Sequence, residues 1–446
     1  MSNPATPNLH KAGKPNLHGV GTANSPPAKG EYPEGGRGFL PKLRFSEFRD
    51  EGEWANVPID ALLSVRNERL APTDKLPLYS LTIEDGITPK SARYSRDFLV
   101  ADPGKKKYKL VEPQDIVFNP SNLRWGAISH SRLSHAVVVS PIYEVLYVKD
   151  RSATCFDFVA RALMRPEQIA RFIEKGQGTL VERIAVKIEF FVETILPIPM
   201  NWQEQQKIAD CLNSLDDLIA AENQKLEALR QHKQGLMQQL FRQLGETVPR
   251  LRFPEFIEAP RWQISTFGER CESFSGSTPD TSNKTYYGGT IPFIRSAEIG
   301  SDKTEIFLTK EGLKNSAAKM VRRGDLLVAL YGANSGDTAL ARVDGAINQA
   351  IMCLRSNDSV QFLYHYLIAR KNWIITTYLQ GGQGNLSGQI VLSVKLSIPD
   401  KDEQQKIAAC LNSLDDVIAA KNGKLETLRY HKQGLMQQLF PSLESY

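Results

Sequence analysis

Two stretches of the chain place apolar side chains at alternating steps of four and three residues. One stretch covers 204–241 and the other 403–440, and each has a polar residue at its central step, Glu222 or Lys421. This heptad spacing predicts an α-helix with one apolar stripe, of the kind that packs against a second helix. The stripe consists of Ile208, Leu212, Leu215, Ile219, Leu226 and Leu229 in the first stretch and of Ile407, Leu411, Leu414, Ile418, Leu425 and Leu428 in the second.

Each predicted helix is long and one-sided. A helix of this length extends for roughly 57 Å, and it is unstable in water unless its apolar face is covered. The other helix is the obvious partner, and we expect the two to pack antiparallel. Glu222 and Lys421 would then lie near the crossing point and form an ion pair that fixes the register. The alternative is that both side chains extend separately into water.

The two helices are copies of one another. Residues 204–241 align without gaps on 403–440, and 32 of the 38 positions are identical. A second pair of matching segments, 41–48 and 249–256, comes earlier in each half and is followed by Trp54 or Trp262. The chain therefore contains one unit twice, and we expect a pseudo-twofold internal repeat.

The segments between these copies differ in sequence. They contain short apolar runs separated by Gly, Asn, Ser and Asp, and one helical stretch; the runs are 116–118, 136–139, 291–294 and 325–330, and the helical stretch is 362–370. This pattern predicts a mixed α/β fold, with two globular α/β domains separated by two long antiparallel coiled-coil-like helices. The expected domains are 39–200 and 244–400, and the expected helices are 201–243 and 401–446.

Composition narrows the class of protein. Residues 1–38 are rich in Pro, Gly, Asn and Lys and are predicted to be a disordered extension. The net charge of +5 is compatible with nucleic-acid binding but too small to establish it. No apolar run is long enough to predict a membrane span. The chain begins without a secretory signal, and its five cysteines are scattered singly, so we expect a cytoplasmic protein without a metal site.

Catalytic motifs are weak or missing. The segment Asn119-Pro120-Ser121-Asn122 follows an apolar run and partly matches the Asn-Pro-Pro-aromatic loop of amino-methyltransferases. Its third and fourth positions are wrong and no glycine-rich turn precedes it, so we interpret it as an ordinary turn. The sequence contains no Gly-x-x-x-x-Gly-Lys-Ser/Thr loop for ATP. We therefore predict no catalytic residue in this chain.

Polar side chains gather in loops of both domains. Arg pairs with guanine and Asn with adenine through two hydrogen bonds each, while lysines beside a tyrosine suit the phosphate backbone. Gly-flanked segments let backbone N–H groups approach phosphates. Solvated loops and helix-ending turns are the alternative interpretation. The candidate DNA-binding residues are Lys105, Lys106, Lys107, Tyr108, Asn122, Arg124, Trp125, His130, Arg132 and Gln177 in the first half, and Tyr331, Asn334, Ser335, Gln383 and Asn385 in the second.

The first copy of the repeat contains Glu204-Gln205-Gln206-Lys207-Ile208-Ala209, preceded by Leu196-Pro197-Ile198-Pro199, and the second copy repeats this motif at 403–408. Each helix ends with the sequence His-Lys-Gln-Gly-Leu-Met-Gln-Gln-Leu-Phe. These segments resemble those of the specificity subunits of type I restriction-modification enzymes, and the resemblance covers about 41–446. The extension at 1–38 is not part of the family's pattern.

The resemblance implies two target-recognition domains, each reading one half of a split double-stranded DNA sequence, with the helices as a spacer. It also implies that catalysis belongs to partner subunits. In that family two methyltransferase subunits bind S-adenosylmethionine and methylate adenine, and restriction subunits use ATP and Mg²⁺ to translocate and cut. Because the two domains of this chain differ in sequence, the DNA target would be asymmetric. A single-chain DNA adenine methyltransferase and a coiled-coil scaffold that binds only proteins are the competing hypotheses.

Overall fold

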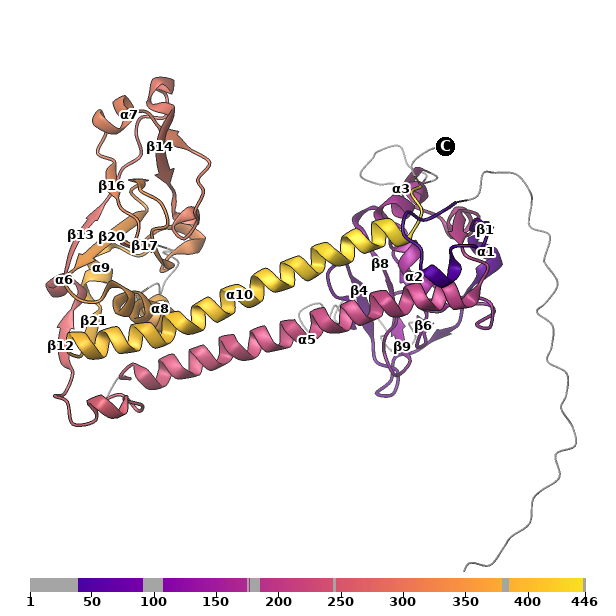
Figure 1. Cartoon of the computed structure of the whole chain (residues 1–446), viewed down its shortest axis with the longest axis horizontal. Helices are drawn as coiled ribbons and strands as arrows, with labels where there is room; N and C mark the ends of the chain where they lie inside the picture. The colour runs from indigo at the N-terminus through magenta and orange to yellow at the C-terminus, as the bar shows by residue number, and fades with distance from the viewer. Residues whose placement is uncertain are drawn as a thin grey trace, which may run out of the picture. The chain divides into compact units, whose positions relative to one another are not determined.

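The computed structural model describes residues 39–90, 107–174, 176, 185–243, 246–378 and 385–443. The predicted disordered extension, 1–38, lies outside these residues. The described chain forms two compact units (Figure 1). Unit 1 combines residues up to Cys211 with the segment that begins at Leu435, and unit 2 contains Leu212–Gly434. Unit 1 is therefore built from two segments that lie far apart in the sequence.

Unit 1 is a mixed α/β structure, as the sequence predicts. Its largest sheet has four strands in the order β2-β10-β7-β8, and smaller sheets have the orders β3-β6-β9, β4-β5 and β1-β11. The elements are β1 (Ala55–Pro58), α1 (Ile59–Leu62), β2 (Leu63–Val65), β3 (Arg69–Leu70), β4 (Tyr79–Thr82), β5 (Gly86–Pro89), β6 (Tyr108–Val111), β7 (Ile116–Phe118), β8 (Ile128–His130), β9 (Val137–Val139), β10 (Glu144–Val148), α2 (Phe156–Leu163), α3 (Pro166–Glu174), α4 (Ile188–Val192), β11 (Ile195–Ile198) and the start of α5 (Trp202–Leu240).

Unit 2 repeats the four-stranded sheet of unit 1. The strands of this sheet in unit 2 follow the order β13-β20-β17-β18, so β18 has the edge position that β8 has in unit 1. The elements are β12 (Gln263–Thr266), α6 (Phe267–Arg270), β13 (Cys271–Ser275), β14 (Tyr287–Ile294), β15 (Phe307–Leu308), α7 (Lys310–Lys314), β16 (Lys319–Val321), β17 (Leu326–Ala329), β18 (Thr338–Leu340), β19 (Gly345–Ile347), β20 (Ile351–Ser356), α8 (Val360–Tyr378), α9 (Gly388–Ser393), β21 (Lys395–Ile398) and α10 (Lys401–Leu439). Unit 2 also contains α5 from Leu212 onward, and its part of α10 ends at Gly434.

The predicted helix boundaries need two corrections. The helix expected over 362–370 is α8, which is twice that length. Its counterpart in unit 1 is broken into α2 and α3, because Pro166 lacks the N–H that a continuous helix needs. The two long helices end at Leu240 and Leu439. Residues 241–243 and 440–443 are predicted to be helical, and this prediction is wrong. The phenylalanine that follows each helix is buried in a unit's core, and Pro441 cannot continue α10.

The recurrent segments of the sequence dock onto each other. In unit 1 the guanidinium of Arg44 donates two hydrogen bonds of 2.7 Å to the Glu204 carboxylate. In unit 2 Arg252 makes the same paired contact with Glu403, at 2.8 and 2.7 Å. Both carboxylates are buried, and a planar guanidinium fits a carboxylate through two parallel bonds. The short opening segment thus anchors the start of the long helix in each unit.

The glutamine after each of these glutamates caps a second helix. The side-chain oxygen of Gln205 accepts a hydrogen bond from the backbone N–H of Cys155, directly before α2, at 2.8 Å. Gln404 accepts the same bond from Ser359, directly before α8, also at 2.8 Å. Backbone N–H groups at a helix start have no partner within the helix. The repeated Glu-Gln pair therefore joins three elements of each unit.

Within unit 2, α5 and α10 pack antiparallel (Figure 1). Lys233 of α5 contacts Asp415 of α10, and Lys432 of α10 contacts Asp216 of α5. The partner position falls along α10 as the position rises along α5, which defines the antiparallel direction. The two ion pairs occupy equivalent positions of the repeat. The helix pair is therefore internally pseudo-symmetric, as expected.

The centre of the helix pair contains an ionic contact that breaks this symmetry. Lys421 donates to the Glu222 carboxylate at 2.8 Å and Lys424 donates to it at 2.9 Å, which confirms the predicted pairing of Glu222 with Lys421. Glu222 is buried in the seam. Hydrogen bonds from Lys421 and then Lys424 lower the pKa of Glu222 to about 2. The carboxylate therefore stays ionised at neutral pH.

A buried histidine makes the stability of unit 2 sensitive to acid. His365 of α8 lies against Asn412 of α10, with Nε2 and Oδ1 2.8 Å apart, and burial lowers the pKa of His365 to about 4. In the unfolded chain the pKa of His365 is near 6.5, so between pH 4 and 6.5 this histidine binds more protons in the unfolded chain than in the folded one. Stability should therefore fall as pH drops from about 6.5 to 4, by at most roughly 3 kcal/mol. His365→Gln should flatten this interval in thermal melts, and identical pH profiles would refute the assignment.

None of the helices in the described part of the chain combines the length and apolar character that a membrane span requires.

Candidate nucleic-acid interface

The turn between β7 and β8 carries several of the predicted DNA-binding residues. It begins at Asn119, whose side-chain oxygen accepts a hydrogen bond from the backbone N–H of Ser121 at 3.1 Å. This is the short turn that Asn and Pro favour, as interpreted from the sequence. A single 3-10 turn, Leu123–Trp125, follows and ends at Gly126 with a left-handed backbone, φ 83°.

Two predicted residues on this turn lie against each other. The guanidinium of Arg124 lies 4.7 Å from the centre of the Trp125 ring. Trp125 is 62% exposed, an unusual position for a large aromatic side chain. The exposed ring with a cation on its face offers a stacking and charge surface of the kind found where proteins meet nucleic acid. Asn122, the residue before this 3-10 turn, is also exposed.

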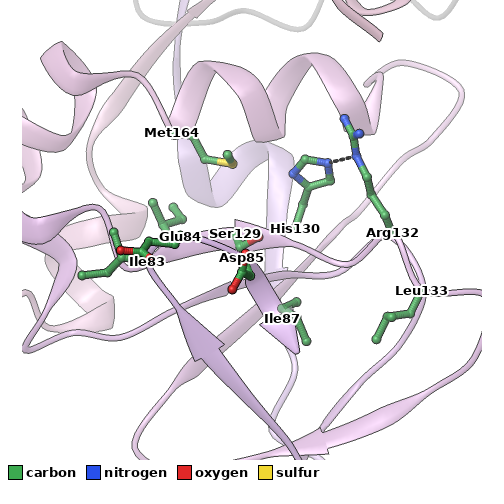
Figure 2. Close-up of a pocket in the computed structure, with 11 residues that line it drawn as sticks. Ile83, Glu84, Asp85, Ile87, Ser129, His130, Arg132, Leu133 and Met164 are labelled. Atoms are coloured by element: carbon green, nitrogen blue, oxygen red, sulfur yellow. Dashed lines mark hydrogen bonds between the residues drawn. The ribbon is translucent and has the colours of Figure 1, made fainter. Parts of the chain in front are cut away.

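His130 and Arg132 lie at a pocket of about 360 Å³ on the edge strand β8 (Figure 2). Arg132 donates a hydrogen bond from Nε to His130 Nε2 at 2.8 Å. The opposite wall comes from the turn between β4 and β5, with Glu84 and Asp85, and Met164 adds an apolar side chain. The pocket therefore combines a cation, two carboxylates and apolar walls.

The pocket depends on a glycine. Gly86 begins β5 with φ +68°, a left-handed conformation that favours glycine. A Cβ atom at Gly86 would lie 2.5 Å from the hydroxyl oxygen of Ser129 on β8. Only glycine lets the β4–β5 turn approach the edge strand this closely. The carboxylates of Glu84 and Asp85 were not predicted as site residues, because the contact between β5 and β8 has no local signal in the sequence.

The structure describes only the end of the predicted lysine run, Lys107 and Tyr108. Lys105 and Lys106 lie outside the described residues. Lys107 is exposed, and Tyr108 begins β6 of the sheet β3-β6-β9 and is half-buried. The next lysine, Lys109, is buried and pairs with Glu144 at 2.5 Å.

Unit 2 has a pocket at the equivalent edge strand. It has a volume of about 590 Å³ and is lined by β18, by the segment 296–301 and by Asn334, Asp337 and Lys371. Lys371 forms an ion pair with Asp337. Tyr331 is exposed at the start of the same turn. The two units thus place pockets of different chemistry at the same topological position.

Two candidate residues in unit 2 stabilise the turn between β17 and β18 through hydrogen bonds to its backbone. Ser335 is buried, and its hydroxyl donates to the carbonyl of Leu330 at 2.9 Å. The side chain of Asn385 accepts a hydrogen bond from the backbone N–H of Gly332 at 3.1 Å. Ser335 is therefore a structural residue of the turn, and Asn385 fixes the turn from a neighbouring segment. Gln177 and Gln383 lie outside the described residues.

Two ion pairs that no sequence motif marks support these sheets, with the carboxylate buried in unit 1 and partly exposed in unit 2. Asp115, directly before β7, accepts two hydrogen bonds from Arg66 at 2.6 and 3.0 Å. The equivalent Asp325, before β17, accepts hydrogen bonds from Arg355 of β20, the shortest of them 2.6 Å from Nη2 to Oδ2. The arginines come from different positions of the two sheets, so no repeated motif marks the pairs. They stabilise the strands that carry the candidate loops.

Comparisons with known proteins give a consistent result. Residues 260–430 match the family described as type I restriction modification DNA specificity domain. The chain is 28% identical over 253 residues to the putative type I restriction enzyme MjaX specificity subunit of Methanocaldococcus jannaschii, covering 55% of this chain and 58% of that protein. It is 24% identical over 161 residues to the EcoR124I/EcoR124II specificity subunit of Escherichia coli, covering 34% and 40%. The chain thus spans about half the length of the curated relatives it matches.

Two solved structures share the fold. The S subunit of a type I restriction-modification system from M. genitalium has a TM-score of 0.57 at 16% identity, over 90% of this chain and 99% of that one. A chain from a structure concerned with complex assembly and conformational transition of the type I R-M system has a TM-score of 0.55, also at 16% identity, over 87% and 98%. The predicted fold class is therefore confirmed.

Proposed function

We propose, from the premise that the chain belongs to the family of type I restriction-modification specificity subunits, that it directs such an enzyme to its DNA target. Each unit would read one half of a split double-stranded sequence. The two half-sites would differ, so the target would be asymmetric.

The observation that carries this proposal is that the two units share their anchoring ion pairs but differ in the side chains that line their pockets. The anchoring pairs, Arg44 with Glu204 and Arg252 with Glu403, recur in both units. The pockets at the equivalent strands β8 and β18 do not recur: one contains His130 and Arg132, and the other contains Asn334 and Lys371. A protein that reads two different sequences from one scaffold needs this combination, since base contacts specify while the scaffold positions them.

The chain would act without catalytic residues of its own. Its expected partners are two methyltransferase subunits, which would bind S-adenosylmethionine, and restriction subunits, which would use ATP and Mg²⁺. The second solved structure concerns complex assembly in its own type I R-M system, which supports a role for this chain in a multisubunit enzyme. The repeated helix pair, identical at 32 of 38 positions, is a suitable surface for two copies of one partner.

The test is reconstitution with the cognate methyltransferase, followed by mapping of methylated adenines in genomic DNA. We expect one split motif with two unlike halves around a fixed gap. The chain alone and the methyltransferase alone serve as controls and should give no motif. Methylation by the chain alone would establish a single-chain methyltransferase, and methylation by the complex without any sequence preference would favour a protein-binding scaffold.

A further inference from the structure

Arg132 is the arginine among the described residues that line the pocket of unit 1, and its Nε donates a hydrogen bond to His130. We propose that Arg132 reads a guanine in the half-site recognised by unit 1, and that His130 is its positioning residue. This inference rests on the proposed function and adds to it the base, the residue that reads it and the unit that carries it.

The hydrogen bond between the two side chains sets the direction of the guanidinium. His130 Nε2 accepts from Arg132 Nε at 2.8 Å (Figure 2), so the neutral imidazole has its proton on Nδ1. With Nε directed at the imidazole, the two Nη groups form the far end of the guanidinium. Their spacing matches the O6 and N7 acceptors of guanine in the major groove.

The histidine is itself held by packing. Its ring contacts Phe156 edge to face, with ring centres 5.6 Å apart, and Phe156 begins the helix α2. His130 ends β8, where it pairs with Ile116 of the buried strand β7. A base-reading side chain loses little conformational entropy on binding when its support is rigid in this way. Arg132, in contrast, is exposed at the rim of the pocket.

The charge of the pocket favours a base over a phosphate. A site for the DNA backbone is expected to be uniformly positive, because each phosphate is an anion. Glu84 and Asp85 line the same pocket as Arg132 and would repel a phosphate bound there. Carboxylates instead accept hydrogen bonds from the amino group of cytosine. An arginine beside carboxylates therefore suits a G·C base pair.

Unit 2 provides an internal comparison. Among the described residues, the side chains that line its pocket at β18 include Asn334 and Lys371 and no arginine. Asn pairs with adenine rather than guanine. The arginine-dependent contact is therefore expected in one half-site only, and the other half-site of the same chain reports on any general loss of folding or binding.

The experiment uses the full chain with its methyltransferase and compares methylation motifs of variants. Arg132→Ala should relax one guanine position in one half-site, with a preference for guanine reduced roughly tenfold to hundredfold. Arg132→Lys should retain part of the preference, because lysine donates without the planar fork. Asn334→Ala is the matched variant in unit 2 and should alter the other half-site.

The positioning role has its own test. His130→Leu removes the acceptor and should relax the same guanine position as Arg132→Ala, whereas His130→Gln keeps an acceptor at a similar distance and should restore the preference. A merely structural role would make both variants defective in the two half-sites alike.

The outcomes separate the inference from the function on which it rests. If the wild-type complex gives no motif, the proposed function fails. If the wild-type motif contains no G·C base pair in either half-site, the inference fails while the proposed function stands. The same holds if Arg132→Ala leaves both half-sites unchanged. The inference also fails if Arg132→Ala and Asn334→Ala alter the same half-site.

Discussion

Glu204→Ala is expected to lower the free energy of unfolding of unit 1 by about 3–5 kcal/mol, the usual cost of breaking a buried ion pair. Glu204 is 1% exposed, and its carboxylate accepts two hydrogen bonds from Arg44 and one from Trp54 Nε1 at 3.2 Å. Removing the carboxylate leaves a guanidinium and an indole N–H without their acceptor. Hydrogen exchange of peptides from β1 and β11 should accelerate, while peptides from unit 2 should keep their protection.

Two further variants make this prediction specific. Lys207→Ala removes an exposed ion pair with Glu47 one turn along the same helix, and it should cost no more than about 1 kcal/mol. The double variant Arg44→Met with Glu204→Met removes both charges at similar volume and should recover much of the loss. If Glu204→Ala proves as mild as Lys207→Ala, the anchor does not hold unit 1 together.

Phe440→Ala should destabilise unit 1 by about 3–5 kcal/mol, although it lies at the other end of the chain. Phe440 is buried in the core of unit 1, where its ring stacks on Phe158 at 5.2 Å and meets Trp54 edge to face at 6.2 Å. Arg165 holds the same segment by donating to the carbonyl of Pro441 at 3.0 Å. Loss of the ring leaves a cavity between β-sheet and helix side chains that cannot close completely.

The controls for this prediction lie on the same repeat. Tyr430→Ala removes an aromatic ring that is 79% exposed on α10 and should be nearly neutral. Phe241→Ala removes the counterpart of Phe440 and should destabilise unit 2 instead, because Phe241 packs against Phe362 with ring centres 5.5 Å apart. Calorimetry with hydrogen exchange assigns each loss to a unit. Equal effects of Phe440→Ala on both units would contradict the assignment.

Both predictions depend on the fact that each unit contains parts of both long helices. Unit 1 contains the start of α5, the last residues of α10 and the segment that follows α10, and unit 2 contains the rest of both helices. Each core is therefore completed by the end of the helix that begins in the other half of the sequence. Folding of unit 1 requires residues from both ends of the chain, so we expect its stability to depend on the whole chain.

Local features of the fold can be predicted from the sequence because they depend on spacing within one segment. The heptad stripes predict α5 and α10, and the difference between Glu222 and Lys421 within otherwise similar copies predicts their contact. The strands at 116–118 and 325–330 are recognisable as apolar runs. Helix ends are harder to predict, because Pro166 breaks one copy of a helix that runs unbroken in the other.

The contacts between segments that lie far apart in the sequence are decided only in the tertiary structure. The pocket beside β8 needs the β4–β5 turn, more than 40 residues earlier in the chain, and the contact exists because Gly86 has no side chain there. The ion pairs of Asp115 and Asp325 use arginines from different positions, since Arg66 directly follows β2 and Arg355 lies on β20. A duplicated helical frame with unlike domains is evident from the amino-acid sequence, since periodicity and identity are local. The position of the candidate pocket at one edge of each sheet depends on long-range strand pairing, which no single segment encodes.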